Sequence, residues 1–250
     1  MNTLIAANWK MYKTIVEARD TAAALSLAVP QADCDVLIFP PFTALAATRE
    51  ALTLPGAAIG GQDVYPAAEG AFTGEIAPAM LLEAGCEWVL AGHSERRNIL
   101  GESPDFVGRK TSFALDAGLK VMLCIGETLQ EREAGQLAAV LARQLESGLR
   151  DVRDTLRADQ LSIAYEPVWA IGTGKTATSE DIVASHTVVR NLLTTLRGDT
   201  GRDIRILYGG SVKPGNARDI LALDNVGGLL VGGASLQVES FVEIIRAAAA

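Results

Sequence analysis

The sequence repeats one pattern along its length, and this repetition limits the chain to very few folds. A short, mostly apolar run with β propensity is followed by a turn signal and a segment with helical periodicity, at intervals of about thirty residues. Such apolar runs are typical of strands covered on both faces. The expected strands cover residues 4–8, 36–39, 58–62, 88–92, 121–125, 162–165, 205–208 and 229–231. The expected helices cover residues 16–27, 44–52, 106–115, 137–149, 182–196 and 241–245.

Strict alternation of strands and helices predicts an α/β fold with a parallel sheet, either an open doubly wound sheet or a closed barrel. No G-x-G-x-x-G pattern follows the first expected strand, which weakens the dinucleotide-binding form of the open sheet. Eight evenly spaced units favour closure, and 250 residues is a usual length for one such barrel. We therefore predict a single domain over residues 1–250, a (β/α)8 barrel of eight parallel strands with outer helices.

Composition and charge argue against several classes of function. The formal net charge of −8 disfavours binding to nucleic acid or to an anionic membrane surface. No apolar stretch approaches the roughly 18 residues that span a bilayer, and the N-terminus is too short and too polar for a secretory signal, so we expect a cytoplasmic protein. Two histidines argue against a metal site. Three cysteines without C-x-x-C spacing predict buried, reduced thiols at Cys34, Cys86 and Cys124.

Polar residues gather at the ends of the expected strands, where the chemistry of such barrels takes place. They are Asn8, Lys10, Gln62, His93, Glu95 and Glu166. Glu166 is a candidate base, although a solvated surface glutamate is the usual alternative. His93 precedes an expected helical turn whose N–H groups would keep the imidazole neutral, so that it can donate to a carbonyl oxygen. A core histidine satisfied by the backbone is the competing interpretation.

Lys10 would place a positive charge near a developing oxyanion, with Glu95 as the partner that positions it. A base, a neutral hydrogen-bond donor and a cation, without metal or redox cofactor, suit proton abstraction next to a carbonyl group.

Glycine-containing segments follow the last three expected strands at residues 171–174, 208–211 and 231–234. Their backbone N–H groups could approach a bound anion, and loops at these positions form the phosphate site of many barrels. Simple tight turns are the alternative for any one segment. Gly174-Lys175-Thr176 resembles the end of a Walker A loop, but Trp169 occupies a position where that motif requires glycine, so a nucleotide-binding P-loop is rejected.

Six segments in order resemble the signature segments of the triosephosphate isomerase family, and the likeness covers essentially the whole chain. They are Asn8-Trp9-Lys10 and the segments at residues 70–75, 92–97, 165–174, 208–212 and 231–236. The resemblance implies a TIM barrel that interconverts dihydroxyacetone phosphate and glyceraldehyde 3-phosphate through an enediolate. It also implies that Glu166 moves the carbon-bound proton and that His93 serves the two oxygens. Lys10 and Asn8 would assist electrostatically. Backbone amides near Gly172, Ser211, Gly232 and Gly233 would hold the phosphate.

The resemblance further implies a mobile lid and a homodimer. Pro167, Val168 and Trp169 match one hinge of the family's lid, Lys175, Thr176 and Ala177 match the other, and the tip lies at Ala170, Ile171, Gly172, Thr173 and Gly174. The loop that contains Gln62 and Thr73 would reach the neighbouring subunit, with Thr73 near Asn8 and Lys10 of the partner subunit. Two alternatives remain: another phosphate-binding barrel enzyme that acts on a larger sugar phosphate, or a catalytically silent scaffold on the same fold.

Overall fold

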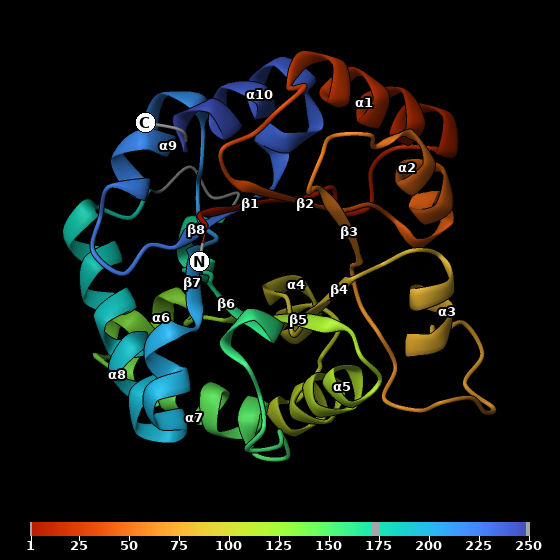
Figure 1. Cartoon of the computed structure of the whole chain (residues 1–250). Helices are drawn as coiled ribbons and strands as arrows, with labels where there is room; N and C mark the ends of the chain where they lie inside the picture. The colour runs from red at the N-terminus through yellow and green to blue at the C-terminus, as the bar shows by residue number, and fades with distance from the viewer. Residues whose placement is uncertain (1, 172–175, 249–250) are drawn as a thin grey trace.

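A computed structural model of the chain describes residues 2–171 and 176–248, and these form a closed parallel barrel surrounded by helices (Figure 1). The described strands are β1 (Leu4–Asn8), β2 (Asp35–Phe39), β3 (Ala58–Gly61), β4 (Trp88–Ala91), β5 (Lys120–Ile125), β6 (Leu161–Tyr165), β7 (Arg205–Tyr208) and β8 (Gly228–Val231). They are hydrogen-bonded in sequence order, and β1 pairs with both β2 and β8, which closes the barrel. The predicted fold class is therefore confirmed.

Two apolar layers hold the barrel together, because alternate residues of each strand point to opposite faces. Leu4 and Ala6 belong to the cluster inside the barrel, whereas Ile5 and Ala7 join the larger cluster between strands and helices. Gly60 makes room for the interior, since a Cβ atom there would lie 2.4 Å from the ring of Phe39. The uninterrupted apolar strands of the sequence reflect this burial on both faces.

The helices run around the barrel, as Figure 1 shows. Thr14 and Thr178 begin α1 and α8 with capping boxes that satisfy free N–H groups, and Pro104 lies in the first turn of α5. The bounds are α1 (Ile15–Ala28), α2 (Leu45–Ala51), α3 (Pro78–Glu83), α4 (Ser94–Asn98), α5 (Pro104–Asp116), α6 (Leu129–Glu133), α7 (Leu137–Leu149), α8 (Ser179–Asp203), α9 (Pro214–Leu221) and α10 (Val238–Ala247).

The observed elements differ from the predicted ones in small ways. Each predicted strand end lies within one residue of the observed end, so Gln62 and Gly92 come just after β3 and β4 instead of ending them. No helix range was predicted for α3, α4, α6 or α9, although a helical turn was expected after His93. All three cysteines are free and buried, as predicted. No helix in the described part of the chain is long and apolar enough to cross a membrane.

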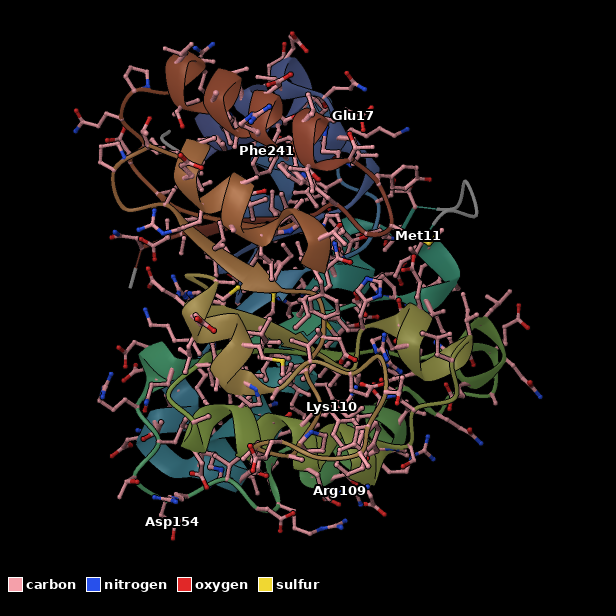
Figure 2. The ribbon with its side chains drawn as sticks, turned by 90° about the vertical axis from the view of Figure 1, so that its right-hand side faces the viewer. Met11, Glu17, Arg109, Lys110, Asp154 and Phe241 are labelled. Carbon is pink, nitrogen blue, oxygen red and sulfur yellow. The ribbon has the colours of Figure 1, made fainter. Side chains whose placement is uncertain are left out.

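A buried cluster of charged side chains joins the loop after β3 to α4 and α5. The Lys110 ammonium on α5 is fully buried and lies 2.6 Å from Asp63 Oδ1 and 2.5 Å from Glu102 Oε1. Arg96 on α4 contacts the same two carboxylates at 2.8 and 2.6 Å. Figure 2 shows Lys110 inward of its neighbour Arg109. These ion pairs hold the loop after β3 against α4 and α5, the two helices that follow β4.

Candidate active site

The carboxyl ends of the strands surround a pocket of about 440 Å³. Apart from Leu230, which lies inside β8, the described lining consists of residues that end strands or follow them. The lining residues are Asn8, Lys10, His93, Glu166, Ala170, Ile171, Gly209, Gly210, Ser211, Val212, Lys213, Leu230, Gly232, Gly233 and Ala234. Most of the residues that the sequence analysis singled out at strand ends therefore meet in one place.

Glu166 follows β6 directly, and its side chain is only 1% exposed. Its backbone N–H donates to the carbonyl of Ile125 on the neighbouring strand, which fixes where the side chain begins. Oε1 lies 3.0 Å from His93 Nε2, and Oε2 accepts a 2.8 Å hydrogen bond from the Ser94 backbone N–H. The carboxylate is thus held against the loop that follows β4.

His93 precedes α4, and its side chain accepts a hydrogen bond from the first turn of that helix. The Glu95 backbone N–H donates to Nδ1 over 3.3 Å. Because Nδ1 acts as an acceptor, this hydrogen bond assigns the proton of a neutral imidazole to Nε2, the atom that faces Glu166. The neutral state of this imidazole stays a prediction.

Lys10 has a left-handed backbone with φ 51°, which is unusual for a residue with a side chain. Three contacts hold it there. Its N–H donates to Asn8 Oδ1 at 3.0 Å, its carbonyl accepts from Gln62 Nε2 at 2.8 Å, and its ammonium lies 2.5 Å from Glu95 Oε1. Gln62, predicted as part of a dimer loop, therefore contacts Lys10 within its own chain.

Glycines and Ser211 form the wall of the pocket after β7 and β8. Gly210 packs against the ring of Tyr208, where a Cβ atom would lie 2.2 Å from the tyrosine oxygen. The Asn216 side chain accepts from the Lys213 N–H at 2.7 Å and donates to the Ser211 carbonyl at 3.1 Å, which fixes the turn between them. Gly232 and Gly233 line the same wall. Gly172, the fourth predicted phosphate contact, lies outside the described residues.

The first half of the predicted lid forms a short 3-10 helix over Val168–Ala170, following Pro167. Trp169 Nε1 donates to Glu127 Oε1 at 2.8 Å, and Glu127 also accepts from Tyr165 and Arg132. Ala170 and Ile171 reach the pocket lining. Of the other predicted lid residues, Thr173, Gly174 and Lys175 lie outside the described residues, while Thr176 is exposed and Ala177 is buried.

Several residues at the site had no assigned role in the sequence analysis. Arg97 donates to the carbonyls of Gly92 and Gly126 and brings Nη2 within 4.0 Å of Glu166 Oε2. A Cβ atom on Gly126 would lie 1.8 Å from the Glu166 carbonyl oxygen, so only glycine fits between these loops. Arg97 stands inside a recognised segment and could have been noticed, whereas no sequence pattern marks Gly126.

Cys124 on β5 lies inside the barrel near the base. Burial, followed by the negative charge of Glu166, raises the pKa of its thiol well above the usual range. The thiol therefore stays protonated and unreactive. In the described residues, no group of three or more His, Cys, Asp or Glu side chains could hold a metal ion.

The loop between β3 and α3 carries Thr73, which is exposed and is absent from the pocket lining. In Figure 1 this loop extends away from the barrel. Phe72 packs on Tyr65 with ring centroids 4.3 Å apart, which gives the loop some internal structure. Within one chain, then, Thr73 does not join the other candidate site residues.

Comparison with known proteins decides the family. The family model described as triosephosphate isomerase matches residues 3–248. The chain belongs to the triosephosphate isomerase family. The triosephosphate isomerase of Nitratidesulfovibrio vulgaris (strain DSM 19637 / Miyazaki F) is 59% identical over 99% of this chain and 100% of its own length. That of Oleidesulfovibrio alaskensis is 57% identical over the same shares.

A solved structure supports the assignment to the triosephosphate isomerase family. The crystal structure of triosephosphate isomerase from Bartonella henselae matches with a TM-score of 0.89 and 38% identity, covering 99% of each chain. The match extends over the barrel and its loops together, so the resemblance predicted from six sequence segments is confirmed.

Proposed function

We propose that this protein is an aldose–ketose isomerase that interconverts dihydroxyacetone phosphate and D-glyceraldehyde 3-phosphate. One observation carries the proposal: the Glu166 carboxylate and the His93 Nε2 atom lie 3.0 Å apart in a pocket with a glycine-lined wall. The family and the names of the relatives support the same reaction. The full-length matches do not favour the two alternatives, a larger sugar phosphate as substrate or a silent scaffold.

The arrangement of charges suits a proton transfer between adjacent carbons. Glu166 would leave its hydrogen bond with Ser94, take a proton from one carbon and return it to the next. The Nε2–H of His93 would donate to the oxygens of the enediolate, which a neutral imidazole does without losing its own proton early. Lys10, held by Glu95 and Gln62 and adjacent to Asn8, would stabilise the oxyanion.

The opposite wall of the pocket would hold the phosphate through backbone amides near Ser211, Gly232 and Gly233, and near Gly172 in the segment outside the described residues. The lid over residues 167–177 would close on the bound substrate and exclude water, so that the enediolate keeps its phosphate group. The contact between Trp169 and Glu127 supports a defined position for the first hinge.

We also propose that the chain, one barrel domain over residues 1–250, works as a cytoplasmic homodimer through the loop containing Thr73. Large apolar side chains are exposed in the segments that follow β1 and α4, among them Met11 at 96% and Ile99 at 76% exposure. Exposure of such large apolar side chains to water is unfavourable in a monomer, whereas contact with a second copy of the chain would bury them. Lys10 would then be approached by Gln62 of its own subunit and by the loop containing Thr73 of the other subunit.

A coupled assay tests the reaction directly. Purified protein is incubated with one of the two triose phosphates, without added metal or cofactor. The product, the other triose phosphate, is detected with a coupling dehydrogenase that is specific for it. We expect turnover in both directions. A folded protein without detectable turnover would defeat the proposal. Glu166→Gln, which keeps the shape but loses the basic carboxylate, serves as the matched control.

A further inference from the structure

The charges around the pocket come in opposite pairs, with one exception. The Lys10 ammonium lies 2.5 Å from Glu95, and the Glu166 carboxylate lies 4.0 Å from the Arg97 guanidinium. These pairs leave almost no net charge on that side of the pocket. The whole chain carries −8, so an approaching dianion meets a repulsive field overall.

The exception is Lys213, which lines the pocket and is exposed. Within the part of the chain that the structure describes, its ammonium has no carboxylate within salt-bridge distance and no hydrogen-bond partner. Among the described lining residues, it is therefore the one whose full charge remains available to a ligand. The sequence predicted no role for Lys213.

The backbone that carries Lys213 is fixed. The Asn216 side chain bridges the Lys213 N–H and the Ser211 carbonyl, at 2.7 and 3.1 Å. The turn that follows Ser211 therefore also sets where the Lys213 side chain begins. The side chain itself is long and solvated, so it can follow an anion from solvent to the wall of the pocket.

We propose that Lys213 is a binding residue for the phosphate dianion, attracting it to the glycine-lined wall and strengthening its retention there. The inference rests on the proposed function for the identity of the substrate, a phosphate monoester, but not for the binding of the anion itself. Lys213 takes no part in the proton transfer. Its contribution is electrostatic, so ionic strength must control it.

The first test compares two variants with the same change in net charge. Lys213→Gln removes the unpaired charge at the pocket, and Arg202→Gln removes an exposed charge near the end of α8, paired with Asp199. At low ionic strength, about 0.01 M, we expect kcat/KM of Lys213→Gln to fall by about three- to tenfold through KM. Near 1 M salt, where the screening length is about 3 Å, the difference should vanish. Lys213→Arg should restore the wild-type salt dependence.

The second test measures binding without turnover. Inorganic phosphate is titrated into wild type and both variants by calorimetry at low salt, after circular dichroism has shown equal folding. Weaker phosphate binding by Lys213→Gln alone supports the inference, even if the isomerase assay fails. Active enzyme in which Lys213→Gln and Arg202→Gln bind phosphate equally, with equal salt dependence, overturns the inference and leaves the proposed function intact.

Discussion

Both oxygens of the Glu166 carboxylate have a partner, His93 on one side and the Ser94 N–H on the other. A carboxylate held in this way is accurately placed but must exchange a partner before it can accept a proton from carbon. The length of the side chain decides whether it can do both. At the scale of one residue, reach is therefore as important as charge.

Shortening the base tests this reach. We expect Glu166→Asp to reduce kcat by on the order of 10²-fold, because retraction of the carboxylate by about 1 Å misplaces it relative to the substrate carbon. The affinity for inorganic phosphate should change little, because the phosphate is expected to bind at the glycine-lined wall on the other side of the pocket. Steady-state kinetics measure the effect, with the exposed Glu83→Asp as control. Near-normal turnover in Glu166→Asp would show that another group is the base.

A second histidine, His186 on α8, makes stability depend on pH. Burial lowers its pKa from 6.5 to about 4, and Nδ1 faces the Asn225 carbonyl. The His186 side chain binds a proton near pH 6.5 in the unfolded chain but not in the folded protein. The contribution of the neutral side chain to the free energy of unfolding is therefore fully present above pH 6.5 and is lost as the pH falls towards 4. The loss reaches on the order of 3 kcal/mol at the acid end.

Urea unfolding at fixed protein concentration between pH 7 and pH 4.5 measures this loss. His186→Gln should lower the free energy of unfolding at pH 7 but flatten its decline with acid relative to wild type. The slopes are compared instead of the absolute values, because the substitution itself disturbs packing between Tyr165 and Tyr208. Parallel slopes would exclude His186 as the group responsible.

Sequence alone identified the residues whose chemistry depends on position along a strand. Glu166, His93 and Lys10 could be selected because each follows an apolar run in a barrel pattern. Gly126 and Lys213 could not, since the close contact of the first depends on the carbonyl of another loop and the proposed role of the second depends on its lack of a partner among the described residues. Contacts between loops are set by three-dimensional closure, which residue order does not display.

At the scale of elements, short helices were the least predictable. Periodicity needs several turns to be visible, and α3 covers only Pro78–Glu83, while α9 covers Pro214–Leu221. Both begin with proline, which indicates a helix start but says nothing of its length. The longer α7 and α8 were visible because their apolar stripes extend over several turns. The strand bounds were predicted to within one residue because strands buried on both faces are continuous apolar runs, which begin and end sharply in the sequence.

The buried cluster around Lys110 stabilises the packing of α5 against the loop after β3. We expect Lys110→Met to lower the free energy of unfolding by about 3 kcal/mol or more, because Asp63 and Glu102 then remain buried with only Arg96 as partner. Burial already raises the pKa of Asp63, with the charge of Lys110 opposing that rise. Removal of the lysine should therefore also favour a protonated Asp63.

The neighbouring Arg109 provides a matched control. Its side chain is exposed, and its guanidinium lies over the ring of Phe106 at 5.3 Å. Arg109→Met should cost less than about 1 kcal/mol. Urea denaturation of both variants at equal concentration compares them. Equal effects of the two substitutions would mean that the buried cluster adds no more than a surface contact.

For the whole molecule, one rule connects fold and site: closure of eight parallel strands brings their carboxyl ends into a ring. This is why residues as distant as Lys10, His93 and Ser211 line one pocket. The rule says nothing of surfaces beyond the ring. The loop with Thr73 stands outside it, and a contact with a second copy is a property that one chain cannot display.

A charge in the proposed dimer contact tests assembly. Met11→Glu should weaken the dimer by at least about tenfold, since burial of an unpaired carboxylate is unfavourable. Sedimentation at several concentrations measures dissociation, and turnover should fall on dilution in step with it. Leu27→Glu, an exposed residue near the end of α1, should leave the assembly unchanged. Unaltered sedimentation of Met11→Glu would place the contact elsewhere.

The close approach of Gly126 to the Glu166 carbonyl restricts how this chain can evolve. Even alanine would place an atom 1.8 Å from that oxygen, so every other amino acid at this position displaces the main chain that bears Glu166. Selection for catalysis would then keep this position invariant for reasons of spacing between two loops, although Gly126 has no functional group. In a library of single substitutions, nearly every change at Gly126 would reduce activity, and the residue could then be mistaken for a catalytic one.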